Sequence, residues 1–430
     1  MSFASLGVAE PVARALAEAR QTVPTPIQAA AIPVAITGRD LIGIAQTGTG
    51  KTAAFAVPIL HRLALDRRRP AAKSCRVLVL SPTRELSGQI ADCFRTYGRH
   101  LKVGVALVIG GVPIGRQIRE LAHGVDILVA TPGRLVDLCR SRAVTLAGTD
   151  CLVLDEADRM LDMGFIHDVR RLVAMLPRKR QTLLFSATMP AEIAGLAEEM
   201  LSDPQSIGVA PPASTVQRVD QRVLFVSREA KAARLAETLQ GEPIDRALVF
   251  TRTKHGADKL VRVLAKSGVA AEAIHGNKSQ GQRERVLGAF REGRVRNLVA
   301  TDIAARGIDV AGITHVVNYD MPSDPESYVH RIGRTARAGR AGTAISFCSA
   351  DELPILRSIE KLIRRPIEVS PGGEHLESVD HATPRVPSRG RSRRSNGGAV
   401  YRKRSPHHRD GARDSAVRRG GPTLRGDHGR

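Results

Sequence analysis

Short runs of apolar and β-branched residues recur through the first half of the chain and alternate with segments of helical periodicity. Because these runs lack polar alternation, they predict strands that are buried on both faces, as in a parallel sheet covered by helices. One α/β domain is therefore predicted over residues 1–205. Its predicted strands lie at residues 40–45, 75–81, 125–131, 150–155 and 182–188.

A second series of the same kind follows a segment rich in Pro and Ser, which predicts a linker over residues 206–217. It predicts a second α/β domain over residues 218–368, so the fold class is two tandem α/β domains with parallel sheets flanked by helices. The predicted strands of this domain lie at residues 246–251, 271–276, 296–302, 314–320 and 342–348.

The pattern ends near residue 369. Residues 369–430 are rich in Arg, Ser and Gly and show almost no apolar periodicity. Such a segment buries too little surface to offset its ordering entropy, so disorder is predicted. A basic arm on RNA or DNA is the favoured interpretation, and a solvated tail is the alternative.

The charge of the chain favours a polyanionic partner. Lys and Arg number 65 against 43 acidic residues, which gives a net charge of +22. Aromatic residues are only 3% of the chain and Trp is absent, which argues against a protein that stacks bases on aromatic platforms. A nucleic acid held by its backbone is therefore expected.

Neither the cysteines nor the apolar segments indicate a metal site or a membrane span. The five cysteines are scattered without metal-ligand spacing, as is typical of reduced cytosolic proteins. The N-terminus does not resemble a signal peptide, and no window of about 18 residues is apolar enough to span a membrane. We expect a cytoplasmic protein without a membrane partner.

A glycine-rich segment, "AQTGTGKT" at residues 45–52, follows a predicted strand and opens a predicted helix. Glycines at such a junction let backbone amides surround a phosphate chain at the N-terminus of the helix. The lysine reaches the outer phosphates and the following hydroxyl binds Mg²⁺. The predicted nucleotide-binding residues here are Thr47, Gly48, Thr49, Gly50, Lys51 and Thr52.

A cluster of carboxylates ends another predicted strand, in "VLDEAD" at residues 153–158. Alone, such a cluster is more often a solvated loop. Paired with the phosphate loop, it predicts that Asp155 binds Mg²⁺ and that Glu156 orients and deprotonates the attacking water.

These two segments, with others in the same order, resemble the DEAD-box ATP-dependent RNA helicases of superfamily 2, of the bacterial RhlE-like type. The resemblance covers about residues 1–365 and implies two RecA-like domains. The remaining motifs are "PTPIQ" (24–28), "PTREL" (82–86), "GG" (110–111), "TPGR" (131–134), "SAT" (186–188), "ATDIAARGID" (300–309) and "HRIGRTARAG" (330–339).

The ATP site gains residues from both domains in this way. The Gln28 amide offers a donor and an acceptor that suit adenine. The resemblance adds Phe3 near the base, Gly307 and Asp309 near the ribose, and Arg334 and Arg337 as cations for the γ-phosphate. Two positions depart from the family pattern. Gln21 stands where an aromatic is common, and Ala336 stands where Gly is common.

The RNA site is expected to contact phosphates and sugars with little sequence specificity, and to prefer RNA through its 2′-hydroxyls. Its predicted residues are Thr83, Arg84, Gly110, Thr131, Arg134, Gln280, Arg283 and Thr301. Asp158, Ser186 and Thr188 are predicted to couple the two sites, and His330 and Arg331 to link Glu156, Asp155 or the domain interface.

The sequence therefore predicts an ATP- and Mg²⁺-dependent RNA helicase that unwinds short duplexes or remodels RNA–protein complexes. Ribosomal precursors, ribosome assembly and RNA-degradation proteins are candidate targets and partners. An annealing or assembly chaperone driven by the basic tail, and a DNA-directed motor, are the alternatives.

Overall fold

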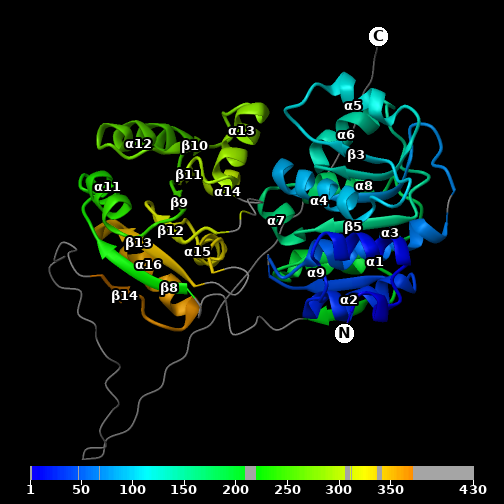
Figure 1. The fold of residues 1–430 in the computed structure, drawn as a ribbon, viewed down its shortest axis with the longest axis horizontal. Coiled ribbons are helices and arrows are strands. Elements are labelled where there is room, and N and C mark those ends of the chain that lie inside the picture. The colour runs from blue at the N-terminus through cyan, green and yellow to red at the C-terminus, as the bar shows by residue number, and fades with distance from the viewer. Residues whose placement is uncertain are drawn as a thin grey trace, which may run out of the picture. The chain divides into compact units, whose positions relative to one another are not determined.

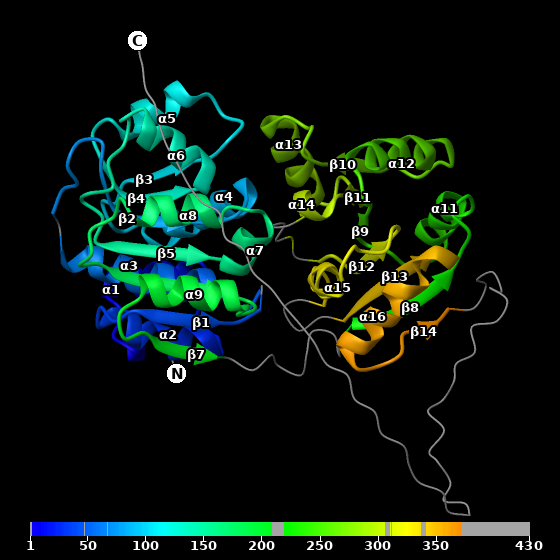
Figure 2. The same cartoon turned by 180° about the vertical axis from the view of Figure 1, so that it is seen from behind.

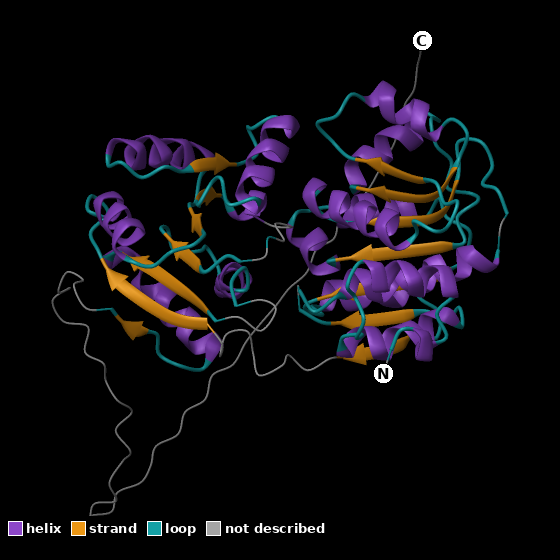
Figure 3. Cartoon of the chain, viewed as in Figure 1, coloured by secondary structure: helices purple, strands orange, loops and turns teal. Residues whose placement is uncertain are grey.

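The computed structural model describes most of the chain up to residue 370 (Figure 1). Both predicted α/β domains are present, and the strands of each run between helices (Figure 3). No helix within the described part of the chain is both long and apolar enough to cross a lipid bilayer. The described residues are 2–46, 48–66, 68–208, 219–305, 310, 312–336 and 341–370.

The described strands of the first domain form one parallel sheet in the order β3-β4-β2-β5-β6-β1-β7. The strands are β1 (Leu41–Ile44), β2 (Cys75–Leu80), β3 (Val105–Val108), β4 (Val125–Ala130), β5 (Cys151–Asp155), β6 (Gln181–Ser186) and β7 (Gln205–Gly208). The helices are η1 (Ala4–Leu6), α1 (Glu10–Glu18), α2 (Pro26–Ile36), α3 (Lys51–Leu65), α4 (Arg84–Tyr97), α5 (Ile114–Leu121), α6 (Pro132–Arg140), α7 (Ala157–Asp162), α8 (Ile166–Val173) and α9 (Ala191–Met200).

The described strands of the second domain form a parallel sheet in the order β10-β11-β9-β12-β13-β8-β14 (Figure 2). The strands are β8 (Val219–Phe225), β9 (Ala247–Phe250), β10 (Glu272–Ile274), β11 (Asn297–Ala300), β12 (His315–Asn318), β13 (Gly342–Cys348) and β14 (Glu368–Val369). The helices are α11 (Lys231–Gly241), α12 (Lys254–Lys266), α13 (Gln280–Arg291), α14 (Asp302–Ala305), α15 (Pro325–Ile332), η2 (Ala350–Glu352) and α16 (Leu353–Ile363).

Continuous apolar strands arise because both faces of the first sheet are covered. Along β2, Val77 and Val79 face a cluster that includes Phe55 of α3, whereas Leu78 and Leu80 face a cluster that includes Leu135 of α6. All of these side chains are fully buried. A strand between two such layers has no exposed face on which polar residues would alternate.

The boundaries differ from the predicted ones in two places. The segment predicted as a linker begins inside β7, whose residues pair with β1 from Leu41 to Ile44, so the first sheet extends to Gly208. At the other end, Val369 belongs to β14 and pairs with Val223, one residue into the predicted tail. Residues 209–218 and 371–430 lie outside the described residues.

Candidate active site

The phosphate loop connects β1 to α3 and depends on glycine. Gly48 and Gly50 have φ of 87° and 93°, a region that L side chains rarely adopt. A Cβ on Gly50 would also lie 2.3 Å from Nε2 of Gln28. Lys51 is buried, and its Nζ donates a hydrogen bond of 2.8 Å to the carbonyl of Ala45. The ammonium group is therefore held inside the loop at the start of α3.

Gln28 closes one end of this loop. Its Oε1 accepts a hydrogen bond of 2.9 Å from the Thr25 amide, and its Nε2 donates one of 3.1 Å to the Gly50 carbonyl. These two contacts set the orientation of the side-chain amide. They use one of its two N–H donors and one of the two lone pairs on its oxygen. Gln21 lines the same cavity as Gln28, whereas Phe3 is buried in the hydrophobic core.

The carboxylates of "DEAD" lie at the end of β5, in the central part of the sheet. Asp155 is only 2% exposed. Burial raises the pKa of Asp155 to about 7, against the opposing effect of Lys51 and with a further increase from Glu156. Burial also opposes ionisation of Glu156, but the nearby Arg159 and Lys51 outweigh it and lower the pKa of Glu156.

These groups meet in one cavity of about 500 Å³. Within the described residues, Oδ1 of Asp155 is buried without a hydrogen-bond partner. A buried carboxylate oxygen without a donor, in a cavity that a threonine also lines, is a donor set suited to a hard cation, so Asp155 and Thr52 fit Mg²⁺. The cavity is lined by Gln28, Gly48, Gly50, Lys51, Thr52, Asp155, Glu156 and Arg334, among others.

Asp158 connects the end of β5 to the loop that follows β6. Its backbone N–H donates to Oγ of Ser186 at 3.2 Å, and its Oδ2 accepts from both the amide and the hydroxyl of Thr188, at 2.9 and 3.0 Å. The structure thus brings together the three residues that the sequence groups as coupling residues.

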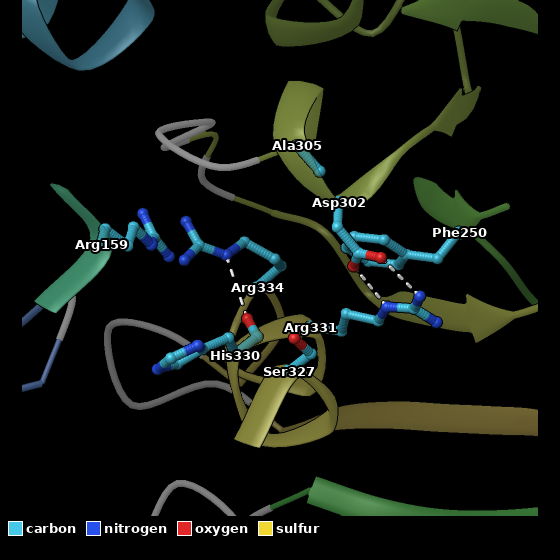
Figure 4. A pocket seen from close by; sticks show the side chains of 8 residues that line it. All are labelled: Arg159, Phe250, Asp302, Ala305, Ser327, His330, Arg331 and Arg334. Carbon is cyan, nitrogen blue, oxygen red and sulfur yellow. Dashed lines mark hydrogen bonds and ion pairs between the residues drawn. The ribbon is translucent and has the colours of Figure 1, made fainter. Parts of the chain in front are cut away.

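Arg331 was expected to link Glu156, Asp155 or the domain interface. Its guanidinium group forms a bidentate pair with the carboxylate of Asp302, at 2.6 and 2.7 Å, so its described contacts include neither Glu156 nor Asp155. Its role at the domain interface stays a prediction. Figure 4 shows Arg331 directed at Asp302, while Arg334 extends the other way toward Arg159. Arg334 Nε donates to the carbonyl of His330 at 3.2 Å. Two cations that are close in sequence therefore have different tasks. Thr47, Gly307, Asp309 and Arg337 lie outside the described residues.

The predicted RNA-binding residues of the first domain follow the ends of β2, β3 and β4. Thr83 caps α4, and its Oγ1 accepts from the Leu86 amide at 3.2 Å. Arg84 lies against Gly110 and Gly111, since a Cβ on Gly111 would sit 2.3 Å from its guanidinium group. Arg134 donates to the Val112 carbonyl at 2.8 Å. A pocket of about 310 Å³ is lined by Thr83, Arg84, Gly110, Thr131 and Arg134, among others.

In the second domain, Gln280 and Arg283 lie on the first turn of α13, and Thr301 directly precedes α14. Arg283 donates to the Glu85 carboxylate at 2.8 Å. Glu85, Met163 and Phe165 line the same pocket as the predicted RNA-binding residues, although the sequence analysis did not single them out. Glu85 directly follows Arg84 in "PTREL", which was the available signal; nothing comparable marked Met163 or Phe165.

Comparisons with known proteins cover both domains. The DEAD/DEAH box helicase family matches residues 25–196, and the helicase conserved C-terminal domain matches residues 230–339. The chain is 44% identical over 344 residues to the DEAD-box ATP-dependent RNA helicase CshA of Bacillus subtilis, covering 80% of this chain and 69% of that protein. It is 43% identical over 367 residues to CshA of Geobacillus kaustophilus, covering 85% of this chain and 78% of that protein.

Among solved structures, S. cerevisiae Dbp5 bound to RNA and ADP BeF3 matches with a TM-score of 0.75 at 31% identity, over 86% of this chain and 95% of that one. These matches agree with the two RecA-like domains, while the RhlE-like type stays a prediction. Identity at this level to relatives that are matched over more than two thirds of their length shows that the chain belongs to the DEAD-box ATP-dependent RNA helicases.

Proposed function

We propose that ATP and RNA together draw the two domains into a closed state, which bends one RNA strand and separates a short duplex, and that hydrolysis reopens it. The observation that carries this proposal is the convergence of Lys51, Asp155 and Glu156 on one cavity that Arg334 of the second domain also lines. Cations and acids that come from different domains make hydrolysis depend on closure.

The ATP chemistry follows from the residues of the cavity. The amides of the phosphate loop and Lys51 bind the phosphate chain, and Gln28 orients the adenine. Thr52 and Asp155 are the groups that would hold Mg²⁺, which supplies charge neutralisation at the phosphates. Glu156, kept ionised by its lowered pKa, accepts a hydrogen bond from the attacking water and orients it. Arg334 and Arg337 stabilise the charge that develops on the transferred phosphoryl group.

RNA binding is proposed along the loops that follow the strands of both sheets. Arg84, Arg134 and Arg283 offer guanidinium groups to phosphates. Thr83 and Thr131 are the N-cap residues of α4 and α6, whose N-termini also favour phosphates. None of these groups is proposed to read a base edge. Binding through the phosphate backbone and the 2′-hydroxyl would therefore select RNA but discriminate little between RNA sequences.

The test is ATP hydrolysis measured with and without single-stranded RNA. Lys51→Ala and Glu156→Gln are expected to abolish RNA-stimulated turnover, whereas Lys179→Ala, an exposed lysine outside the cavity, should retain it. ATP turnover indifferent to RNA, or retained by Glu156→Gln, would contradict the proposal. Equal stimulation by single-stranded DNA would favour a DNA-directed motor.

An annealing chaperone is the second candidate, because the net charge of +22 is accompanied by an Arg-rich segment at residues 369–430. Deleting residues 371–430 separates the two. A helicase core keeps its RNA-stimulated ATPase activity and loses mainly RNA affinity, whereas an annealer loses annealing.

A further inference from the structure

Arg159 directly follows the "DEAD" segment, and its sequence position alone indicates no role for it. It lies on α7, is only 3% exposed, and its Nη1 contacts Oε2 of Glu156 at 2.5 Å. Glu156 is the N-cap residue of α7, and Arg159 lies three positions later in the first turn of that helix. The carboxylate that is proposed to orient the attacking water is thus bound by a buried cation of the same domain.

Glu156 requires such a partner for two reasons. It is 3% exposed, and a buried carboxylate without a compensating charge is costly. Its backbone has φ of 56° and ψ of 53°, the left-handed region, so it departs from the line of β5 at the start of α7. Its side chain has several rotatable bonds beyond this point. A planar guanidinium group on Oε2 restricts the carboxylate to one direction.

Arg159 is itself tied to the loop that follows β6. Its backbone N–H donates to Oδ1 of Asp158 at 3.0 Å, and Oδ2 of the same carboxylate accepts from the amide and the hydroxyl of Thr188. A continuous series of contacts therefore runs from Thr188 through Asp158 and Arg159 to Glu156. These contacts connect the loop to the Glu156 carboxylate through one helical turn.

We propose that Arg159 is a positioning residue for ATP hydrolysis, which holds the Glu156 carboxylate toward the attacking water and makes its placement depend on the loop at residues 186–188. This inference rests on the proposed role of Glu156. The alternative is that the buried ion pair only stabilises the fold. In that case the effect of Arg159 on the hydrolysis rate would not depend on the catalytic role of Glu156.

A double-mutant cycle separates these two roles. ATP hydrolysis is measured with saturating RNA for the wild type, Arg159→Gln, Glu156→Gln and the double variant, by single-turnover kinetics so that slow variants can be followed. The KM for ATP is measured for the wild type and Arg159→Gln. Arg171→Gln is the matched control, because Arg171 also pairs with an acid three positions away, Asp168, but on the exposed surface of α8.

We expect Arg159→Gln to lower the hydrolysis rate on the order of 10- to 100-fold, the cost of a misplaced catalytic group, with a KM for ATP within about twofold of the wild type. In the Glu156→Gln background the same change should alter the rate by less than about twofold, because the group that Arg159 positions is already absent. Arg171→Gln should behave as the wild type. If Arg159→Gln does not fold, as judged by circular dichroism, Arg159→Lys enters the same cycle.

Equal rate losses from the Arg159 variant in both backgrounds, or an unchanged rate in the wild-type background, would overturn the inference. Its failure is distinct from that of the proposed function. Glu156→Gln alone tests the latter, so a cycle in which Glu156→Gln stops turnover but the Arg159 effect is the same in both backgrounds rejects only the positioning role.

Discussion

Single residues show most directly how the phosphate loop is built. Gly50 combines a positive φ with close contact to the Gln28 amide, which in turn contacts the Thr25 backbone. A side chain at position 50 would therefore strain the backbone and displace the residue that is proposed to orient adenine. Gly50 therefore connects the glycine-rich loop with the residue that is proposed to recognise the base.

Gly50→Ala is accordingly expected to weaken ATP binding by about tenfold or more, since a strained left-handed residue costs about 1–3 kcal/mol and the clash adds to it. Titration with a fluorescent ATP analogue measures this change. Gly195→Ala is the control, because Gly195 lies within α9 and a Cβ there would meet nothing within 4 Å. An unchanged affinity for Gly50→Ala would contradict the account of the loop.

Functional residues could be predicted from the sequence where their type and spacing indicate a chemical role. Lys51 begins α3 directly after a glycine, and Asp155 ends β5 before further acids. At such positions residue type and spacing indicate a task. Arg159 could not be predicted, because an arginine on a short helix is usually exposed, and only the structure shows it buried against Glu156. The pairing of Arg331 with Asp302 was not predicted for the related reason that sequence does not show which acid an arginine meets.

At the scale of elements, a buried ion pair joins several segments of the second domain. Lys231, on the first turn of α11, donates to Oε2 of Glu352 at 2.6 Å and also to the carbonyls of Tyr319 and Phe347, which follow β12 and end β13. Glu352 further accepts from the Met321 amide at 3.2 Å. The pair therefore joins α11 and η2 to the carboxyl ends of the interior strands β12 and β13.

Glu352→Gln is expected to lower the free energy of unfolding of the second domain by about 3 kcal/mol at pH 7, because it leaves Lys231 buried and unpaired. Burial opposes ionisation of Glu352, but Lys231 and Ser349 outweigh it and hold the pKa of Glu352 below its usual 4.5. The folded state thus binds its proton less readily than the unfolded state. The stabilisation is complete above pH 4.5 and is lost as pH falls through the lowered pKa.

Hydrogen–deuterium exchange of β13 measures this local stability. The difference between wild type and variant should stay constant from pH 7 to pH 5 and shrink below pH 4.5. Glu229→Gln, at an exposed position before α11, is the control and should change little. A difference that grew as the pH fell would show that the sign of this argument is wrong.

Strands that are fully buried were predicted from the sequence, whereas several partly exposed strands were missed. Strands such as β5, with every residue buried, were recognised from their apolar runs. Most of the edge strand β7 was taken for a linker, because Gln205, Ser206 and Gly208 are polar or small and exposed, and only Ile207 is buried. Its pairing with β1 therefore leaves little trace in composition. β8 was also missed, because its polar positions interrupt the apolar run.

At the scale of the whole molecule, the net charge of +22 should make RNA affinity fall steeply with salt. Each phosphate neutralised on a single strand contributes a log–log slope of roughly 0.7. Arg84→Gln is expected to weaken binding uniformly across RNA sequences and to reduce the slope by about that amount. Fluorescence anisotropy at several salt concentrations measures the slope, with Arg171→Gln as the control. An Arg84→Gln slope equal to that of wild type would remove Arg84 from the proposed RNA site.

Two α/β domains could be predicted from the repeated strand pattern, because each half contains its own buried sheet. Their RecA-like type was implied by the family resemblance. The proposed need for both domains in ATP hydrolysis could not be predicted from this pattern, because hydrophobic periodicity indicates only burial within a domain. In the proposed mechanism, arginines such as Arg334 take part in hydrolysis only when the domains come together.

The measurement that tests this claim most directly is single-molecule energy transfer between dyes on the two domains. Cysteines introduced at the exposed positions Glu198 and Lys259 carry the dyes, with the half-buried Cys93 and Cys139 replaced by serine. A distinct closed distance is predicted only when a non-hydrolysable ATP analogue and RNA are both present. The same distribution of distances with both ligands as with neither, or full closure with RNA alone, would contradict the account.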